Sequence, residues 1–315
     1  MERWSGVLKI PLNASTSNYY RVASSLCLSS SSSQNLAVPS ANAIFFHGDR
    51  VQDTGNHVIE RLYDLQKVAE IIVSKFGNSV NVFVVESSVF NGPFAIYKDF
   101  VPSVNQWGAP KSYSPIGFPA SSSIVSLLSS CLHEVILKKS KEEINQIASS
   151  VHQCPKTFVL GFSKGGVVMN QLMSEISSLD TNFAETTSSA MIEEPQIIPA
   201  SKESFLNSIS EVHYIDVGLN SSGAYITDQN VVQRISQRLA RDVNSLRIVI
   251  HGTPRQWCDE HRGWILKEKD ELVRLLKSEG ENSGGKLEVH ERFYFSDRLA
   301  DLQMHFDIID AMDVS

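Results

Sequence analysis

The sequence predicts an α/β fold: one domain on a mostly parallel sheet of about eight strands, with helices on both faces. Short β-branched runs alternate with segments of helical periodicity, the pattern of a parallel sheet covered by helices. No linker or internal repeat divides the 315 residues. Hydrophobic residues make up 42% of the chain, enough for a large core. We therefore expect residues 1–315 to form a single domain.

The first half of the chain supplies an edge hairpin and then the first alternating units. Runs 6–12 and 19–28 leave no room for a helix between them, so we expect an antiparallel hairpin, with a Ser-rich loop completing residues 1–40. Strands follow at 43–46 and 80–85. Between them, apolar residues at three- and four-residue steps predict a helix over 58–72 that ends before Gly77.

Residues 86–120 show no periodicity and carry scattered aromatic side chains among Gly and Pro. Unstructured connections of this length are often functional in compact domains, so a pocket wall or lid is one interpretation. An irregular segment packed over the end of the sheet is the other. Both stay open from the sequence.

The second half repeats the alternation. We expect strands at 157–160, 212–215, 246–250 and 287–293. Helices are expected at 124–136, 167–176, 231–239 and 263–277, and a short helical run near 306–312. Residues 177–210 are predicted to be a mobile surface insertion, because their first part is acidic, rich in Ser and Thr, and aperiodic.

Composition excludes several classes of protein. The net charge is −7 and no Lys/Arg block is present, which argues against a nucleic-acid partner. Four widely spaced cysteines fit a reducing compartment and predict neither a disulfide framework nor a zinc site, and we expect no cofactor or metal. No apolar run reaches membrane-spanning length and no secretory signal is readable. A cytoplasmic or mitochondrial location is expected.

The segment 161–165 reads G-x-S-x-G, directly after an apolar strand and directly before an amphipathic helix. Small residues on either side of Ser163 allow the sharp strand-to-helix turn that presents a nucleophilic serine. A capping serine in a Gly-rich turn is the simpler alternative. The backbone N–H of Lys164, at the start of the helix, is a candidate oxyanion donor, and Gly48 or Asp49 after the third strand is the candidate second donor. The Asp49 side chain would oppose an oxyanion unless it turns away or pairs with Lys164 or Arg50.

A nucleophilic serine needs a histidine base, which in turn needs an orienting carboxylate, in the chain order Ser, acid, His. His305 is the preferred base because it follows the last strand. His251 and His261 are fallbacks, and His290 is expected on the sheet surface. Asp259, after the penultimate strand, is the preferred acid, and Asp216, at the end of the preceding strand, is the alternative. Either aspartate could instead bind a loop backbone or Arg255.

Several segments together resemble the eukaryotic family named for human chromosome two open reading frame sixty-nine. They are Phe45 to Asp49, Gly161 to Gly165, Tyr214 to Gly218, His251 to Asp259 with Gly263 to Ile265, and His305-Phe306. The resemblance runs from about Ala43 to the end of the sequence. It implies an α/β-hydrolase-like fold and a Ser-Asp-His triad that maps onto Ser163, Asp259 and His305. Animal members are associated with mitochondria.

These features predict a serine hydrolase acting on a small-molecule or acyl substrate, an ester or thioester. The alternative is a non-catalytic protein of the same fold that binds a ligand or partner through the same cleft. A nucleotide-binding protein is disfavoured, because residues 161–166 lack both Walker and dinucleotide spacings.

Overall fold

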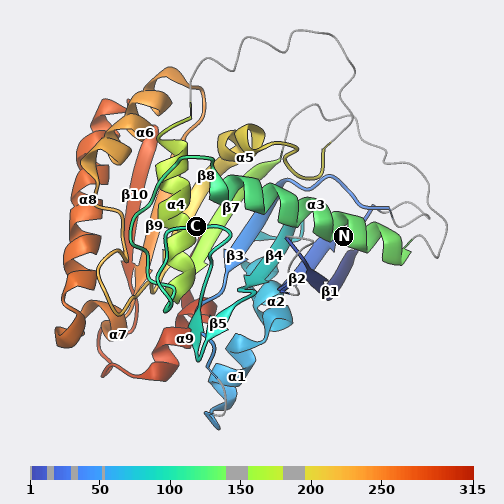
Figure 1. Cartoon of the computed structure of the whole chain (residues 1–315), viewed down its shortest axis with the longest axis horizontal. Helices are drawn as coiled ribbons and strands as arrows, with labels where there is room; N and C mark the ends of the chain where they lie inside the picture. Colours follow the sequence, from blue (N-terminus) through green and yellow to red (C-terminus); the bar gives the residue numbers. More distant parts are fainter. Residues whose placement is uncertain (1, 13–17, 30–34, 52–53, 140–154, 180–195) are drawn as a thin grey trace.

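The computed structural model of the chain contains one eight-stranded sheet and describes all residues except 1, 13–17, 30–34, 52–53, 140–154 and 180–195. The strands follow the order β1-β2-β4-β3-β7-β8-β9-β10 (Figure 1). Six of them pair in parallel. The predicted mostly parallel α/β sheet is confirmed.

The antiparallel part of the sheet lies at one edge. Strands β1 (Arg3–Ile10) and β2 (Tyr20–Cys27) pair antiparallel, which confirms the predicted hairpin. Strand β2 is also antiparallel to β4 (Val80–Glu86), whereas β4 is parallel to β3 (Ala41–Phe46). The hairpin therefore extends a parallel sheet without joining its crossover pattern.

The parallel strands end at the same edge of the sheet. Beyond β3 come β7 (Lys156–Phe162), β8 (Ile209–Ile215), β9 (Leu246–Gly252) and β10 (Leu287–Phe293). Loops that follow strands in such a sheet meet at its carboxyl edge, where open α/β folds bind their ligands. Segments far apart in sequence are thereby brought together.

Helices α1 (His57–Tyr63), α2 (Leu65–Phe76) and α9 (Leu302–Ala311) bury their apolar faces with one face of the sheet. The single helix predicted over 58–72 is wrong, because the chain breaks at Asp64. Asp64 is extended, and its side chain accepts a hydrogen bond from Lys67 N, so it caps the second helix.

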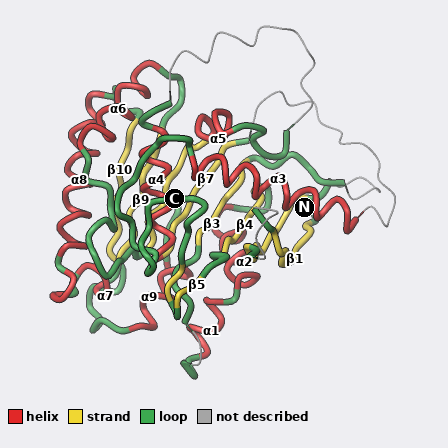
Figure 2. Tube along the Cα trace, viewed as in Figure 1, coloured by secondary structure: helices red, strands yellow, loops and turns green. Residues whose placement is uncertain are grey.

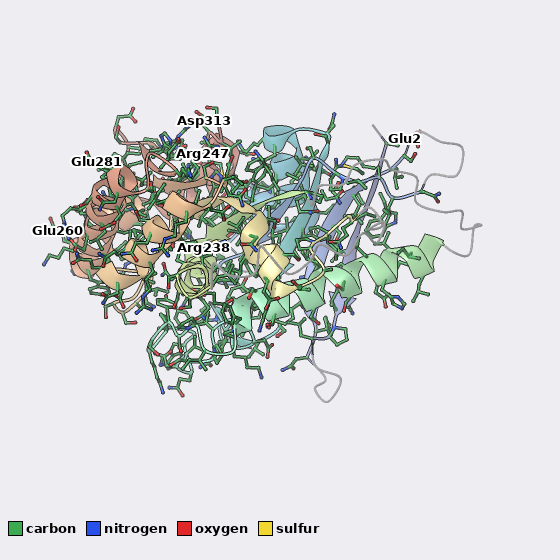
Figure 3. All side chains as sticks on the ribbon, turned by 90° about the horizontal axis from the view of Figure 1, so that it is seen from above. Glu2, Arg238, Arg247, Glu260, Glu281 and Asp313 are labelled. Atoms are coloured by element: carbon green, nitrogen blue, oxygen red, sulfur yellow. The ribbon has the colours of Figure 1, made fainter. Side chains whose placement is uncertain are left out.

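The opposite face is covered by the remaining long helices (Figure 3, where α1 and α2 lie on one side of the strands and α3 on the other). These helices are α3 (Pro119–Lys139), α4 (Gly166–Ile176), α5 (Lys202–Ser208), α6 (Gln229–Arg241) and α8 (Trp264–Asn282). Short helical turns are η1 (Ser163–Gly165), α7 (Pro254–Trp257) and η3 (Glu260–Arg262).

By length and composition, one helix of the described residues, α3, is apolar enough to cross a membrane. A core helix passes the same test. Helix α3 buries Ile124, Leu127, Leu128 and Cys131 completely and contacts α4, α5 and β1. These contacts make it a covering helix of the sheet.

The aromatic loop, residues 86–120, contains the two-residue strands β5 (Phe90–Asn91) and β6 (Phe94–Ala95) and is otherwise largely irregular up to α3 (Figure 2). Both interpretations of the loop describe part of it. Tyr97 and Phe100 are fully buried, and the Tyr97 hydroxyl donates to His47 O at 2.6 Å. Phe94, in contrast, lines a cavity at the carboxyl edge.

The prediction of an insertion over 177–210 is wrong at its C-terminal end. Residues 202–208 form α5, which buries Phe205 and Leu206, and Ile209 begins β8. A capping box between Ser201 and Ser204 starts that helix. Residues 180–195 lie outside the described part of the chain.

Candidate active site

Ser163 lies at the sharp turn between β7 and α4, as the G-x-S-x-G motif predicted. Its φ of 52° is in the left-handed region, which a non-glycine residue occupies at a cost. A Cβ on Gly165 would lie 2.1 Å from Phe46 O, so only glycine allows this close approach to β3. The turn leaves the Ser163 side chain at a cavity, with 8% of the residue exposed.

The loop after β3 lies directly against the serine. A Cβ on Gly48 would be 2.6 Å from Ser163 Cβ, so the absence of a side chain lets the two backbones meet. Gly48 N donates to Nδ1 of the buried His47 at 2.9 Å, which removes it as an oxyanion donor. Among the described residues, Asp49 N has no hydrogen-bond acceptor. Of the two candidates, Asp49 is the one whose N–H is available.

The N–H of Lys164 is available for a different reason. Lys164 is in the first turn of η1, where backbone N–H groups have no partner inside the helix. The positive end of the helix dipole lies at the same point. Lys164 N and Asp49 N are therefore the candidate donors for which no hydrogen-bond acceptor is found among the described residues.

His305 and Asp216 form a direct hydrogen bond. His305 Nδ1 lies 2.6 Å from Asp216 Oδ2, and both side chains are buried. The Asp216 carboxylate also accepts from Thr253 N at 2.8 Å and from Thr253 Oγ1 at 3.0 Å. The Asp216 backbone has a φ of 44° and donates to His251 O. These bonds hold the carboxylate toward α9, which carries His305.

The structure does not bring Asp259 to His305, and this corrects the preferred assignment of the acid. The Asp259 carboxylate accepts from Arg262 Nε at 2.7 Å and from His261 N at 2.9 Å. The hydrogen bond with Arg262 is the main cause of its lowered pKa. Asp259 therefore caps η3, and the alternative, Asp216, has the geometry expected of the acid.

The other histidines lie elsewhere. His251 is buried and hydrogen-bonds with Tyr294 and His213, and burial holds its pKa well below the ordinary value. His261 is in η3 and exposed, and His290 is on β10 with its side chain 47% exposed, as predicted. Of the candidate bases, only His305 lines the cavity with Ser163.

The His305 ring packs on Phe162, the residue before the serine, with ring centroids 4.7 Å apart. No hydrogen bond joins Ser163 Oγ to His305 among the bonds of the described residues. Catalytic hydrogen bonds are often long in ligand-free enzymes and shorten when substrate binds. The two side chains thus line one cavity with no hydrogen bond between them among the described residues.

The Asp49 side chain turns toward Lys164, one of the two ways in which it was expected to avoid an oxyanion. Lys164 Nζ lies 3.7 Å from Asp49 Oδ2, donates to Trp107 O at 3.0 Å and sits over the Phe94 ring. Asp49 Oδ1 accepts from Ala95 N. Burial raises the pKa of Asp49 and lowers that of Lys164, and each charge partly offsets the effect on the other. The pair connects the serine turn to the aromatic loop.

Ser163 and His305 line a cavity of about 210 Å³ at the carboxyl edge of the sheet. Figure 1 shows β5, α7 and α9 at this end of the molecule. Four polar residues of its wall were not predicted as site residues: Asn220, Arg255, Gln256 and Arg262. The feature that could have identified them from the sequence is their position, since all four follow β8 or β9. Among the described residues, no group of three or more His, Cys, Asp or Glu side chains is placed to hold a metal ion.

Comparison with known proteins gives a match to one family and to distant relatives. Residues 153–282 match the sequence model of the C2orf69 family. A zebrafish protein, Mitochondrial protein C2orf69 homolog, is 23% identical over 287 residues, covering 88% of this chain and 74% of its own. The human Mitochondrial protein C2orf69 is 24% identical, covering 78% of this chain and 66% of its own, so the chain spans about two thirds of the human protein.

Three of the solved structures with a similar fold have names that describe hydrolases. A ferulic acid esterase has a TM-score of 0.48 at 10% identity, covering 99% of this chain and 96% of its own. An IroE-like serine hydrolase from Shewanella oneidensis has a TM-score of 0.41 at 12% identity, covering 98% and 78%. A siderophore hydrolase from Aspergillus nidulans has a TM-score of 0.42 at 10% identity, covering 98% and 94%.

Proposed function

The chain belongs to the C2orf69 family, and we propose that it is a serine hydrolase that cleaves a small ester or thioester. The observation that carries this proposal is the 2.6 Å hydrogen bond between Asp216 and His305 at the cavity that holds Ser163. A buried carboxylate on Nδ1 fixes the histidine tautomer that leaves Nε2 free to accept a proton. In this proposal Asp216 takes the role that the sequence assigned to Asp259.

In the proposed mechanism, Ser163 Oγ attacks the substrate carbonyl carbon while its proton passes to His305 Nε2. The negative charge that develops on the carbonyl oxygen is bound by Lys164 N and Asp49 N. The carbonyl then re-forms, the bond to the alcohol or thiol breaks, and His305 gives its proton to that leaving group. Water repeats the sequence on the acyl-enzyme, releasing the acid and restoring Ser163.

The names of the zebrafish and human relatives describe mitochondrial proteins. This supports the mitochondrial option among the two expected compartments, and we propose it for this chain. Expressing a tagged form of the protein in cells of its source organism, and detecting it in the mitochondrial and cytosolic fractions, tests the location.

A fluorophosphonate probe tests the proposed activity, because it reacts covalently with an activated serine. We expect the wild type to be labelled and the Ser163→Ala variant to be unlabelled, with loss of 4-nitrophenyl butyrate hydrolysis in the variant. Ser174→Ala is the matched control, since Ser174 is a buried serine on α4 that donates to Tyr113 O. An unlabelled wild type, or equal labelling of Ser163→Ala, would contradict the proposal.

A non-catalytic ligand-binding protein is the second candidate. The observation that favours it is the missing hydrogen bond between Ser163 and His305 among the described residues. It predicts ligand binding in the same cavity without covalent labelling of Ser163, so the probe experiment separates the two functions.

A further inference from the structure

Two arginines line the cavity that contains Ser163 and His305. Arg255 comes from α7 and Arg262 from η3, and both line the cavity wall. Arg262 donates from Nη2 to Arg255 O at 3.3 Å, so the two residues are in contact. The charge of Arg262 adds to burial in lowering the pKa of Arg255. Two cations held this close to each other favour an anion between or beside them.

The two arginines differ in their partners. Arg262 is neutralised by Asp259, with Nε 2.7 Å from Oδ2. Arg255 has no carboxylate within 4.0 Å among the described residues, and its buried Nε has no hydrogen-bond partner. A buried donor without a partner costs free energy. Arg255 is thus the unneutralised cation of the cavity.

The other charges of the wall do not supply this acceptor. Asp49 is paired with Lys164 and accepts from Ala95 N. Asp216 is fully buried, and its oxygens accept from Thr253 and His305. The carboxylates near the cavity are therefore already engaged.

Gln256, next to Arg255, is a second incomplete group of the same turn. Its Oε1 is buried without a partner, and it lines the same cavity. A Cβ on Gly218 would lie 2.1 Å from Gln256 Oε1, so the glycine makes room for the amide.

We propose that this cavity recognises a small ester or thioester that carries an anionic group, a carboxylate or a phosphate, bound by Arg255. This inference names the substrate class of the proposed hydrolase, and it rests on that proposed function. Guanidinium groups bind both anions through paired N–H donors. The cavity volume of about 210 Å³ limits the molecule to a short acyl or leaving group. Asp259 acts as a positioning residue, because it orients Arg262 beside Arg255.

Matched esters test the charge preference and locate the anion. We would compare kcat/KM for neutral 4-nitrophenyl butyrate with three anionic esters. 4-Nitrophenyl hydrogen glutarate carries a carboxylate on the acyl group, 4-butyryloxybenzoate carries one on the leaving group, and 4-butyryloxyphenyl phosphate carries a phosphate there. We expect the wild type to prefer at least one anionic ester.

Substitution of Arg255 tests the residue. Arg255→Gln should lower the anionic-to-neutral ratio of kcat/KM by about tenfold or more, as expected for loss of a charged hydrogen bond. Arg255→Lys should lie between the wild type and Arg255→Gln, because it keeps the charge without the paired donors. Arg274→Gln is the control, since Arg274 is an exposed residue of α8 that pairs with Glu271. A ratio that Arg255→Gln does not change would overturn the inference.

A binding measurement separates this inference from the proposed function. Calorimetry with glutarate and with phenyl phosphate would use Ser163→Ala and the double variant Ser163→Ala/Arg255→Gln. Weaker binding to the double variant by about tenfold supports an anion site, even if the wild type hydrolyses no ester. Equal affinity in the two proteins, including no binding to either, would overturn the anion site whatever the hydrolysis assays show.

Discussion

The hydrogen bond between Asp216 Oδ2 and His305 Nδ1, 2.6 Å long, joins the end of β8 to α9. The two residues are 89 positions apart in sequence. Thr253, directly after β9, donates twice to the same carboxylate. The bond is therefore held by three elements that meet only when the sheet has formed.

The first prediction compares the two candidate acids. Asp216→Asn should lower kcat for 4-nitrophenyl butyrate by about 10²- to 10⁴-fold, because an amide cannot stabilise the correct histidine tautomer. Asp259→Asn should have a much smaller effect, expressed mainly in KM for anionic esters, since Asp259 contacts Arg262 and not His305. Steady-state kinetics of both variants, with thermal unfolding to verify folding, measure the difference. A larger loss of kcat in Asp259→Asn would contradict the assignment.

The second prediction concerns the close contact between Gly48 and Ser163. Gly48→Ala should lower kcat/KM about hundredfold, because its Cβ would meet Ser163 Cβ at 2.6 Å and displace the loop that carries Asp49 N. Gly263→Ala is the matched control. A Cβ there meets no atom within 4 Å, and its φ of −56° suits alanine. If both variants keep the wild-type rate, the loop after β3 does not hold the oxyanion.

The third prediction is a pH dependence of stability caused by His47. Burial lowers the pKa of His47 from 6.5 to about 4 in the folded protein. The unfolded chain therefore binds a proton that the folded protein does not. The free energy of unfolding is therefore unaffected by this titration above about pH 6.5, and it decreases as the pH falls from 6.5 toward 4.

Urea unfolding at pH 7 and pH 5 measures this effect. His47→Asn should remove about 2 kcal/mol of the loss of stability between the two pH values. His213 and His251, whose pKa values are also lowered by burial, act in the same direction, so part of the dependence remains in the variant. His57→Asn should leave the dependence as it is, since the His57 side chain is 98% exposed. An unchanged slope in His47→Asn would contradict the prediction.

The fourth prediction compares two ion pairs. A double-mutant cycle of Asp49→Asn and Lys164→Met should give a coupling energy of about 1 kcal/mol, because the Lys164 side chain is only 3% exposed. The pair Lys67–Glu70 is shorter, at 2.8 Å, but both side chains are about half exposed. Its coupling should stay below about 0.5 kcal/mol. Equal coupling energies would show that burial does not strengthen the Asp49–Lys164 pair.

Local patterns were sufficient for most of the fold. β-Branched runs and helical periodicity depend on neighbouring residues, so the strand sequence and the edge hairpin could be predicted. The break at Asp64 was missed because the apolar spacing continues across it, while the capping hydrogen bond to Lys67 N depends on the backbone turning there. Helix α5 was missed because a composition typical of disorder precedes it.

The sequence by itself determined that Ser163 would lie on a strand-to-helix turn and that His305 would follow the last strand. Only the tertiary structure decided which aspartate meets His305, which N–H beside Gly48 is free, and that Arg255 and Arg262 face the same cavity as the serine. The physical reason is that each of these outcomes depends on a competition between partners. Asp259 contacts Arg262, three residues away, whereas Asp216 is held toward α9 by Thr253, which directly follows the neighbouring strand β9.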